Sequence, residues 1–271
     1  MASLLIAGYG FLGHALKPLF EARGWQVDCL SRTGGPGVTA CDLSDEDAVL
    51  ALPGEYDLVI HCAASGGGGP DAYRSVYLDG CRHLSSRFSG TPFLFISSTS
   101  VYGQQDHSEV TEASTTVPST ETAAILLEAE RAAIEAGGVV LRLSALCGAG
   151  RCYTATSFIN GRARLDGAGE RVLNFVHRDD VASACYLLAE LGLRAQGQIY
   201  NISSVSLTQL ECYQQLAESY GMALPPVAQP GEVTRRRGSS SKRVLSDKIR
   251  ALGWKPHFAD WLAIARDQGG S

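Results

Sequence analysis

Short apolar runs alternate with helical patterns along most of the chain, and this alternation predicts its architecture. The runs expected to be strands are residues 4–7, 26–30, 58–63, 93–97, 139–143 and 199–202. The segments expected to be helices are residues 11–23, 45–50, 72–88, 121–136, 181–191 and 208–220. Such alternation is typical of a parallel sheet with helices on both faces. We therefore expect an α/β fold built on a doubly wound parallel sheet.

Glycines at a G-x-G-x-x-G spacing lie between the first predicted strand and the first predicted helix. Gly8 would permit a tight turn, Gly10 would let the backbone approach a pyrophosphate, and Gly13 would let helix and strand pack closely. The helix, with Phe11 and Leu12 at its start, would offer unpaired N–H groups to phosphates. Glycine-rich turns are common, but the flanking strand and helix favour a dinucleotide site of Rossmann type over a plain turn.

The residues after the strands matter most, because a doubly wound sheet binds its ligand across the carboxyl ends of its strands. Ser31 and Arg32 follow the second strand, where an NAD-selective site would carry an acid for the ribose 2′-hydroxyl. A hydroxyl and a guanidinium suit a 2′-phosphate and favour NADP over NAD, whereas Asp28 falls inside the strand. Asp42 could accept from the adenine amino group or be a turn carboxylate. His61 reads better as a strand histidine than as a base.

The glycine turn and the strand ends together define the expected cofactor site. Small side chains after the run at 58–63 would let a cofactor lie against the sheet. The expected cofactor contacts are Gly8, Gly10, Phe11, Leu12, Gly13, Ser31, Arg32, Asp42, Leu43, Cys62, Ala63, Ala64, Ser97 and Ser144.

The composition limits the classes to which the chain can belong. With 271 residues, 45% of them hydrophobic, it can bury one large core or two unequal ones. A formal net charge of −5 argues against a general nucleic-acid or anionic-membrane binder. No apolar run is long enough to span a membrane and no basic leader precedes the first strand, so a cytoplasmic protein is expected. The eight cysteines form no C-x-x-C and are expected to be reduced core residues rather than a zinc site, so no metal is expected.

Four segments carry longer motifs. Residues 93–103 contain S-S-x-x-V-Y-G, residues 174–182 are similar to F-V-H-V-D-D-V-A, residues 197–202 to G-x-x-Y-N-I, and residues 252–256 to L-G-W-x-P. Together they resemble the extended short-chain dehydrogenase/reductases, the NAD(P)-dependent epimerase/dehydratase family, over nearly the whole chain. The resemblance implies an NAD(P)-dependent oxidoreductase or epimerase. Ala7 stands at the family's usual first glycine, a shift that resembles its atypical members.

The chain departs from this resemblance where the family's chemistry usually lies. In that family a Y-x-x-x-K pair follows the S-S-x-x-V-Y-G strand, and the lysine lowers the pKa of the tyrosine. Thr122 stands at the tyrosine position and Leu126 at the lysine position, and no tyrosine in the chain has a lysine four residues later. A threonine hydroxyl cannot replace a tyrosine hydroxyl whose pKa has been lowered. Losing a general acid–base costs about 10²- to 10⁴-fold in rate.

Other residues must then carry any chemistry. Ser98 stands where the family's Ser or Thr hydrogen-bonds the substrate oxygen, although it could instead cap the strand end. The remaining candidates for a proton donor are Tyr102, Tyr153 and His177. A tyrosine in such a turn is usually structural, and a histidine before a helix start often stabilises the fold. The expected catalytic residues are Ser98, Thr122 and Tyr102.

Arginines are frequent in residues 149–176 and 203–271, which would form a smaller substrate-binding part. Their planar forks suit phosphate or carboxylate groups, although a solvated basic loop is the alternative. The expected substrate-binding residues are Tyr153, Arg171 and Arg243, with a basic run at 235–237. Residues 1–148 and 177–202 would form the NADP-binding Rossmann domain.

Two functions from different classes fit these residues. The first is an atypical NADP(H)-binding oxidoreductase or epimerase-like enzyme for a small, phosphorylated or nucleotide-linked carbonyl or alcohol, with catalysis that rests on positioning. The second is a non-catalytic NADP-binding sensor or scaffold, favoured by the missing Tyr-Lys pair. A small molecule is the expected partner, and neither nucleic acid nor a membrane is expected. Relatives pair through the helices at 72–88 and 121–136, so a homodimer is compatible with the sequence.

Overall fold

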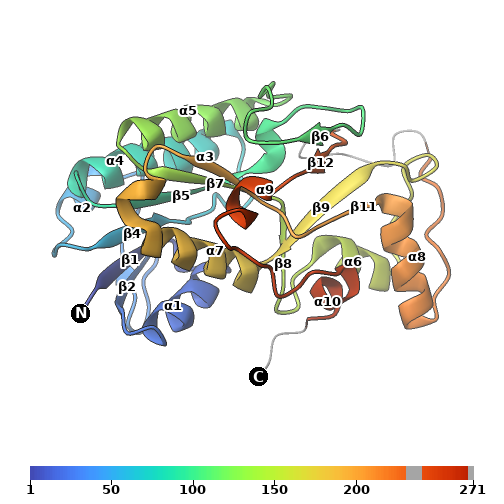
Figure 1. Cartoon of the computed structure of the whole chain (residues 1–271), viewed down its shortest axis with the longest axis horizontal. Helices are drawn as coiled ribbons and strands as arrows, with labels where there is room; N and C mark the ends of the chain where they lie inside the picture. Colours follow the sequence, from blue (N-terminus) through green and yellow to red (C-terminus); the bar gives the residue numbers. More distant parts are fainter. Residues whose placement is uncertain (230–239, 268–271) are drawn as a thin grey trace.

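A seven-stranded parallel sheet forms the centre of the larger part of the protein in the computed structural model, which describes residues 1–229 and 240–267 (Figure 1). Its strand order is β10-β7-β5-β4-β1-β2-β3. The strands are β1 (Ser3–Ala7), β2 (Gln26–Ser31), β3 (Thr39–Ala40), β4 (Leu58–His61), β5 (Phe93–Ser98), β7 (Val139–Leu143) and β10 (Ile199–Ile202). The doubly wound parallel sheet predicted from the sequence is confirmed, and each of the six predicted strands is present.

Helices cover both faces of this sheet, because successive residues of a strand point to opposite sides. Leu4 and Ile6 of β1 pack in the core beneath α1 and α7, whereas Leu5 of β1 packs in the core beneath α2, α4 and α5. The helices of this part are α1 (Gly13–Glu21), α2 (Glu46–Leu50), α3 (Pro70–Tyr73), α4 (Gly80–Arg87), α5 (Glu121–Glu135) and α7 (Arg178–Leu191). None of the described helices combines the length and apolar character needed to cross a membrane.

A smaller body with its own core lies beside the large sheet (Figure 1). Its sheet has the order β11-β9-β8, and its core includes Phe175 and Trp261, whose rings stack 4.2 Å apart. Its elements are β8 (Ala145–Cys147), α6 (Tyr153–Ile159), β9 (Val172–His177), β11 (Val205–Thr208), α8 (Gln209–Tyr220) and α10 (Trp261–Arg266). Short elements connect the two bodies: β6 (Glu109–Val110), β12 (Arg243–Val244) and α9 (Asp247–Arg250).

The strand order reverses next to β1. From β1 the chain first adds β2 and β3 on one side, then crosses to add β4, β5, β7 and β10 on the other. In open α/β sheets the crevice at such a switch point, outside the carboxyl ends of the strands, is where ligands bind. The fold therefore places the ends of β1 and β4 at this crevice.

The helix predicted at 72–88 is interrupted. A π-helical segment, Arg74–Asp79, lies between α3 and α4, and the amide of Gly80 reaches back five residues to the carbonyl of Ser75. The Val76 carbonyl instead accepts from Nε2 of His61 at 3.0 Å. A side chain that bonds into the helix ladder is a known cause of such irregularities.

The prediction that all cysteines are reduced is wrong for one pair. Cys147 and Cys152 form a disulfide, with their Cα atoms 4.5 Å apart. Gly148 and Arg151 form a bridge between them, and this tight bend brings the two sulfurs together. The free cysteines of the described residues are mostly buried: Cys29, Cys41, Cys62, Cys81, Cys185 and Cys212.

A buried polar network ties three strand ends to α5. Nη2 of Arg142 lies 2.7 Å from Oε2 of Glu130, and both side chains are almost fully buried. The Ser97 hydroxyl donates to the same carboxylate at 2.5 Å, and Arg142 donates to the Tyr102 hydroxyl at 2.8 Å. That hydroxyl in turn donates to Oδ1 of Asn201 at 2.9 Å. The ends of β5, β7 and β10 are thus fixed relative to one another.

We expect Glu130→Gln to lower the free energy of unfolding by about 3–5 kcal/mol, because it leaves the Arg142 charge buried without its counter-charge. Urea denaturation at pH 7 measures this loss. Glu128→Gln on the same helix is the matched control, since its partner Arg74 is exposed and the change should stay within about 1 kcal/mol. Equal losses in the two variants would contradict the role of the network.

A second prediction concerns pH. Burial lowers the pKa of His61 to about 4, whereas the unfolded chain takes up this proton near the ordinary value of 6.5. Between these two values the unfolded state binds more protons, so stability falls as the pH falls from 6.5 towards 4. We expect His61→Asn to be less stable at pH 7 but to lose about 1.4 kcal/mol less per pH unit between pH 6 and 4.5. Urea denaturation of both proteins across this range measures the two losses. If the free energy of unfolding fell equally with pH in wild type and His61→Asn, the prediction would be wrong.

Candidate functional site

The first glycine of the turn brings the ends of three strands together. Gly8 directly follows β1 with φ +112°, a left-handed conformation. Its amide and that of Tyr9 donate to the Leu30 carbonyl of β2 at 3.0 and 2.7 Å. A Cβ built on Gly8 would lie 2.2 Å from the amide nitrogen of Ala63, just after β4. Glycine is required here because any side chain would meet the backbone of the neighbouring strand end.

The rest of the turn leaves unpaired amides and open space. The helix begins at Gly13 rather than at Phe11 as predicted, and the amides of Phe11 and Leu12 donate to no described residue. A Cβ built on Gly10 would meet no atom within 4 Å, so the packing of the protein does not itself demand glycine there. The open space would let a ligand approach the backbone closely, and the N-terminus of α1 adds partial positive charge. The residues present fit the diphosphate of a dinucleotide.

The end of β2 carries the residues expected to distinguish the two dinucleotides. Ser31 closes β2, and Arg32 follows it with an exposed side chain. The Asp42 carboxylate accepts from the Ser44 amide at 3.0 Å and its hydroxyl at 2.7 Å, and these bonds, aided by Arg32, keep the pKa of Asp42 below its ordinary value. The Asp42 side chain therefore stabilises the turn that it shares with Ser44. Asp28, the alternative acid, lies inside β2 and accepts from a tyrosine hydroxyl at 2.9 Å.

Small side chains follow β4, as the sequence indicates. The Cys62 thiol donates to the Gly8 carbonyl at 3.2 Å, and burial raises its pKa to about 12, so it stays neutral. Ala63 is half-buried and Ala64 is exposed, while Leu43 is buried in the core below. No bulky side chain therefore follows β4 directly where it meets the glycine turn.

The serines at the ends of β5 and β7 differ in the use of their hydroxyl groups. Ser97 is buried and belongs to the network of Glu130 and Arg142. Ser98 is half-buried and its oxygen accepts from the Ser100 amide at 3.2 Å, which leaves its own proton for another acceptor. The hydroxyl of Ser144 is buried without a hydrogen-bond partner among the described residues, as expected of a group that meets water or a ligand.

The structure of α5 shows what occupies the positions of the missing Tyr-Lys pair. Leu126, at the lysine position, is buried in a small apolar cluster with Val101 and the ring of Tyr102. The Thr122 hydroxyl, at the tyrosine position, shares a hydrogen bond of 3.1 Å with Thr120, which caps the helix. An apolar contact thus replaces the cation of the family's usual pair.

Two of the three other proton-donor candidates are buried and fully engaged. The Tyr102 hydroxyl is bonded to Arg142 and Asn201, and burial raises its pKa. His177 is fully buried; its Nε2 lies 3.0 Å from Oδ2 of Asp267, and its Nδ1 accepts a backbone amide. Both groups are thus occupied by hydrogen bonds within the protein. The geometry favours a structural role for both.

The expected substrate-binding residues are only partly brought together. Tyr153 opens α6 and is 86% exposed, whereas Arg171 is partly buried and its Nε donates to the Ser240 carbonyl at 3.2 Å. Both lie near enough to Tyr213 to influence its pKa, which burial raises. Arg243 donates to a serine carbonyl of β11 at 3.0 Å. The basic run at 235–237 lies outside the described residues.

Lys242 is a buried cation that sequence reasoning missed. It is 4% exposed, and its Nζ donates to the Tyr102 carbonyl at 2.8 Å and the Ser240 hydroxyl at 3.0 Å. Burial lowers its pKa to about 8, and the nearby Arg171 adds to this. It forms no ion pair with a carboxylate in the part of the chain that is described. A lysine in a basic, serine-rich segment gives no sequence signal of burial.

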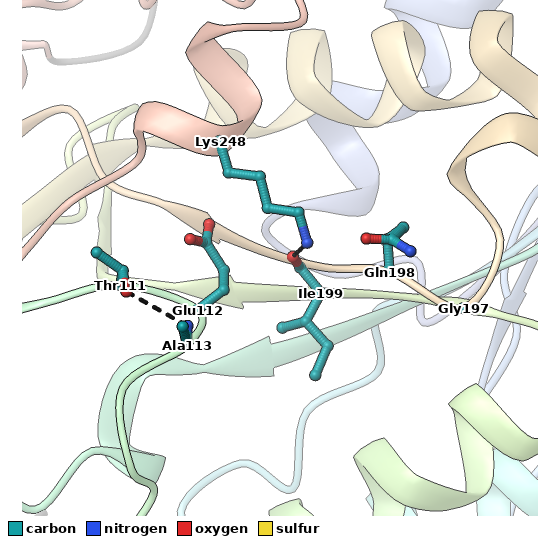
Figure 2. A pocket seen from close by; sticks show the side chains of 7 residues that line it. All are labelled: Thr111, Glu112, Ala113, Gly197, Gln198, Ile199 and Lys248. Carbon is teal, nitrogen blue, oxygen red and sulfur yellow. Dashed lines mark hydrogen bonds between the residues drawn. The ribbon is translucent and has the colours of Figure 1, made fainter.

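A hollow of about 410 Å³ lies beside β10, at the outer edge of the sheet, and Figure 2 shows the side chains that line it. Its lining residues are Thr111, Glu112, Ala113, Gly197, Gln198, Ile199 and Lys248. The Lys248 ammonium donates to the Ile199 carbonyl at 2.8 Å, and the Glu112 carboxylate accepts from the Asn201 amide at 2.7 Å. These side chains complete the hydrogen bonds of an edge strand. Three strands separate β10 from β1, so this hollow is not the crevice of the glycine turn.

Known proteins share both the sequence pattern and the fold of this chain. Residues 4–203 match the model of the NAD dependent epimerase/dehydratase family. Protein YeeZ of Escherichia coli (strain K12) is 33% identical, in a match that covers 97% of this chain and 99% of that protein.

Solved structures extend the comparison to the fold. The human epimerase family protein SDR39U1 (isoform 2), solved with NADPH, has a TM-score of 0.80 at 20% identity and covers 97% of each chain. MoeE5, solved in complex with UDP-glucuronic acid and NAD, has a TM-score of 0.83 at 20% identity and covers 98% of this chain and 97% of that chain. The fold is thus the NAD(P)-binding Rossmann fold, and the chain belongs to the NAD-dependent epimerase/dehydratase family.

Proposed function

We propose that the protein is an NADP(H)-binding oxidoreductase or epimerase-like enzyme that acts on a small, phosphorylated or nucleotide-linked carbonyl or alcohol. The observation that carries the proposal is the turn at the switch point of the sheet, with unpaired amides at Phe11 and Leu12 and open space over Gly10. Arg32 supports NADP over NAD, because a guanidinium forms charge-assisted hydrogen bonds to a 2′-phosphate. Structures of the same fold hold NADPH in one case and NAD in another, so the fold alone does not set the preference, and Arg32 would.

The chain's own residues would bind and orient, while the nicotinamide, when bound, supplies or accepts the hydride. The glycine turn would hold the diphosphate, and Ser31 and Arg32 the 2′-phosphate. Ser98 would donate its unused hydroxyl proton to the substrate oxygen, with Thr122 as a second hydroxyl. Without a tuned phenol, catalysis would rest mainly on positioning, and the proton would come from another group or from water.

We propose further that one body binds the cofactor and the other the substrate. Residues 1–148 and 177–202 would form the NADP-binding domain, and residues 149–176 and 203–271 the substrate-binding part. Tyr153, Arg171 and Arg243 would contribute to substrate binding there, and two chains would pair through the helices at 72–88 and 121–136. Guanidinium groups at this part of the protein support an anionic substrate.

A specific observation also favours a second function, a non-catalytic NADP-binding sensor. Leu126 occupies the lysine position inside an apolar cluster, so this position supplies no cation that could lower the pKa of a catalytic group. A sensor needs the dinucleotide site but not the proton relay. The unused hydroxyl of Ser98 supports the enzyme instead.

We expect wild-type protein to bind NADPH more tightly than NADH. Arg32→Ala should lower the affinity for NADPH about tenfold and change the affinity for NADH by less than about twofold. The reason is that the variant removes one charge-assisted contact to the 2′-phosphate, and about 1.4 kcal/mol corresponds to a factor of ten. Titration of purified protein, followed by nicotinamide fluorescence, measures both affinities.

Two further variants control this experiment. Arg23→Ala removes an exposed arginine that stacks on Tyr186 instead, and should change neither affinity. Gly10→Ala should fold normally yet bind neither dinucleotide well, because its methyl group fills the open space over the turn. Unchanged NADPH binding by Arg32→Ala would remove its role. A wild-type protein that binds neither dinucleotide would overturn the proposed function.

We expect Ser98→Ala to lower kcat/KM for NADPH-dependent reduction of a carbonyl substrate about 100-fold, while the affinity for NADPH stays unchanged. The variant removes the donor to the substrate oxygen but leaves the dinucleotide site intact. Steady-state kinetics with a panel of small carbonyl compounds, beside Ser85→Ala on α4 as a control, measures the effect. Full activity in Ser98→Ala would exclude this role, and no activity in any variant would favour the sensor.

A further inference from the structure

Two arginines lie against the side chain of Phe11 in the glycine turn. The guanidinium carbon of Arg151 is 4.8 Å from the centre of the Phe11 ring, and that of Arg178 is 5.1 Å from it. Both distances lie within the range of a cation–π contact. Phe11 also carries one of the two unpaired amides of the turn. Two positive charges therefore lie one side chain away from the amides that fit an anion.

The bend that carries Arg151 is closed at several points. Gly148 and Arg151 exchange two backbone hydrogen bonds of 3.1 and 2.9 Å. The disulfide between Cys147 and Cys152 joins the residues on either side of the bend. The Asp267 carboxylate accepts a further amide of the bend. The backbone that presents Arg151 is thus fixed by the surrounding structure.

The position of Arg178 depends on the same carboxylate. Arg178 is the first residue of α7, and His177 caps that helix. The His177 ring stacks on Phe258 with centres 3.6 Å apart, and its Nε2 lies 3.0 Å from Oδ2 of Asp267. Asp267 therefore links the two segments that bring Arg151 and Arg178 to one ring.

The described residues neutralise this pair of arginines only in part. Arg151 forms no ion pair with any described carboxylate. Arg178 has only the exposed Asp179, at 3.6 Å from its Nε, and that Nε has no hydrogen-bond partner in the described part of the chain. Guanidinium groups that stack on a ring keep N–H donors free at their edges, where a phosphate oxygen can accept. An anion would satisfy both the charge and these donors.

We propose that Arg151 and Arg178 form a clamp that binds the diphosphate of the dinucleotide, on top of the contacts from the amides of Phe11 and Leu12. This inference rests on the proposed function, because it needs the dinucleotide to lie in the glycine turn. Arg151 follows β8 of the smaller body, whereas Phe11 belongs to the large sheet domain. A diphosphate in the clamp would therefore also connect the two bodies across the crevice.

The test uses the full chain with Arg151→Gln, Arg178→Gln and the double variant. We expect each single variant to lower the affinity for NADPH about tenfold, as loss of one charge-assisted contact would. The double variant should lower this affinity further. Added NaCl should weaken NADPH binding to wild type more than to the double variant, because salt screens the clamp's charges. Arg162→Gln removes an exposed arginine of the smaller body, and its affinity for NADPH should stay within about twofold of that of wild type. Melting temperatures serve as the check on folding, because Arg151 is exposed whereas the Arg178 side chain is only 22% exposed.

ADP is the second probe, because it carries the diphosphate without the nicotinamide or any substrate. We expect the variants to lose affinity for ADP by about the same factor as for NADPH. Variants that bind NADPH and ADP as wild type does would overturn the clamp, even if KM for a phosphorylated substrate rises, since the arginines would then serve the substrate. A wild-type protein that binds no dinucleotide would overturn the proposed function and the clamp together.

Discussion

The close contact between Gly8 and the backbone after β4 is the constraint on which the site depends. Ala63 lies so near that no side chain fits at position 8, and the turn bonds β2 through the Leu30 carbonyl. The ends of β1, β2 and β4 are therefore locked together at the point where the strand order reverses. This junction sets the path of the glycine turn. Along that path the amides of Phe11 and Leu12 donate to no described residue. The proposed phosphate binding would begin from that packing, and the two arginines at Phe11 would add to it.

A second constraint acts at the far side of the crevice. The buried pair of Glu130 and Arg142 fixes Ser97 and, through Tyr102, the end of β10. Ser98 follows Ser97 directly, so its position is set by a network that it does not join. The cost of burying two charges is offset by their hydrogen bonds to each other and to neighbouring hydroxyls. Tyr102, a candidate for catalysis by sequence, is a member of this network.

The charge around the crevice comes from segments far apart in the sequence. Lys242 and Arg171 lie close together and form no ion pair with a carboxylate of the described residues, and Arg151 and Arg178 meet on the ring of Phe11. In the family, a single tyrosine-lysine pair on one helix supplies the chemistry, but here Leu126 belongs to the apolar core. The lysine position on α5 thus carries no charge, while the smaller body and the start of α7 carry several cations. This arrangement suits binding of phosphate groups more directly than it suits proton transfer.

The sequence by itself determined the doubly wound sheet, its six main strands and the glycine turn, because these follow from local periodicity and from short motifs. It also determined the absence of the Tyr-Lys pair. Only the tertiary structure decided that Lys242 is buried, that Cys147 and Cys152 are bonded, and that the helix at 72–88 is interrupted where His61 bonds Val76. These features arise from contacts between residues distant along the chain or across a bend, and neither composition nor spacing encodes which side chains the folded backbone brings together.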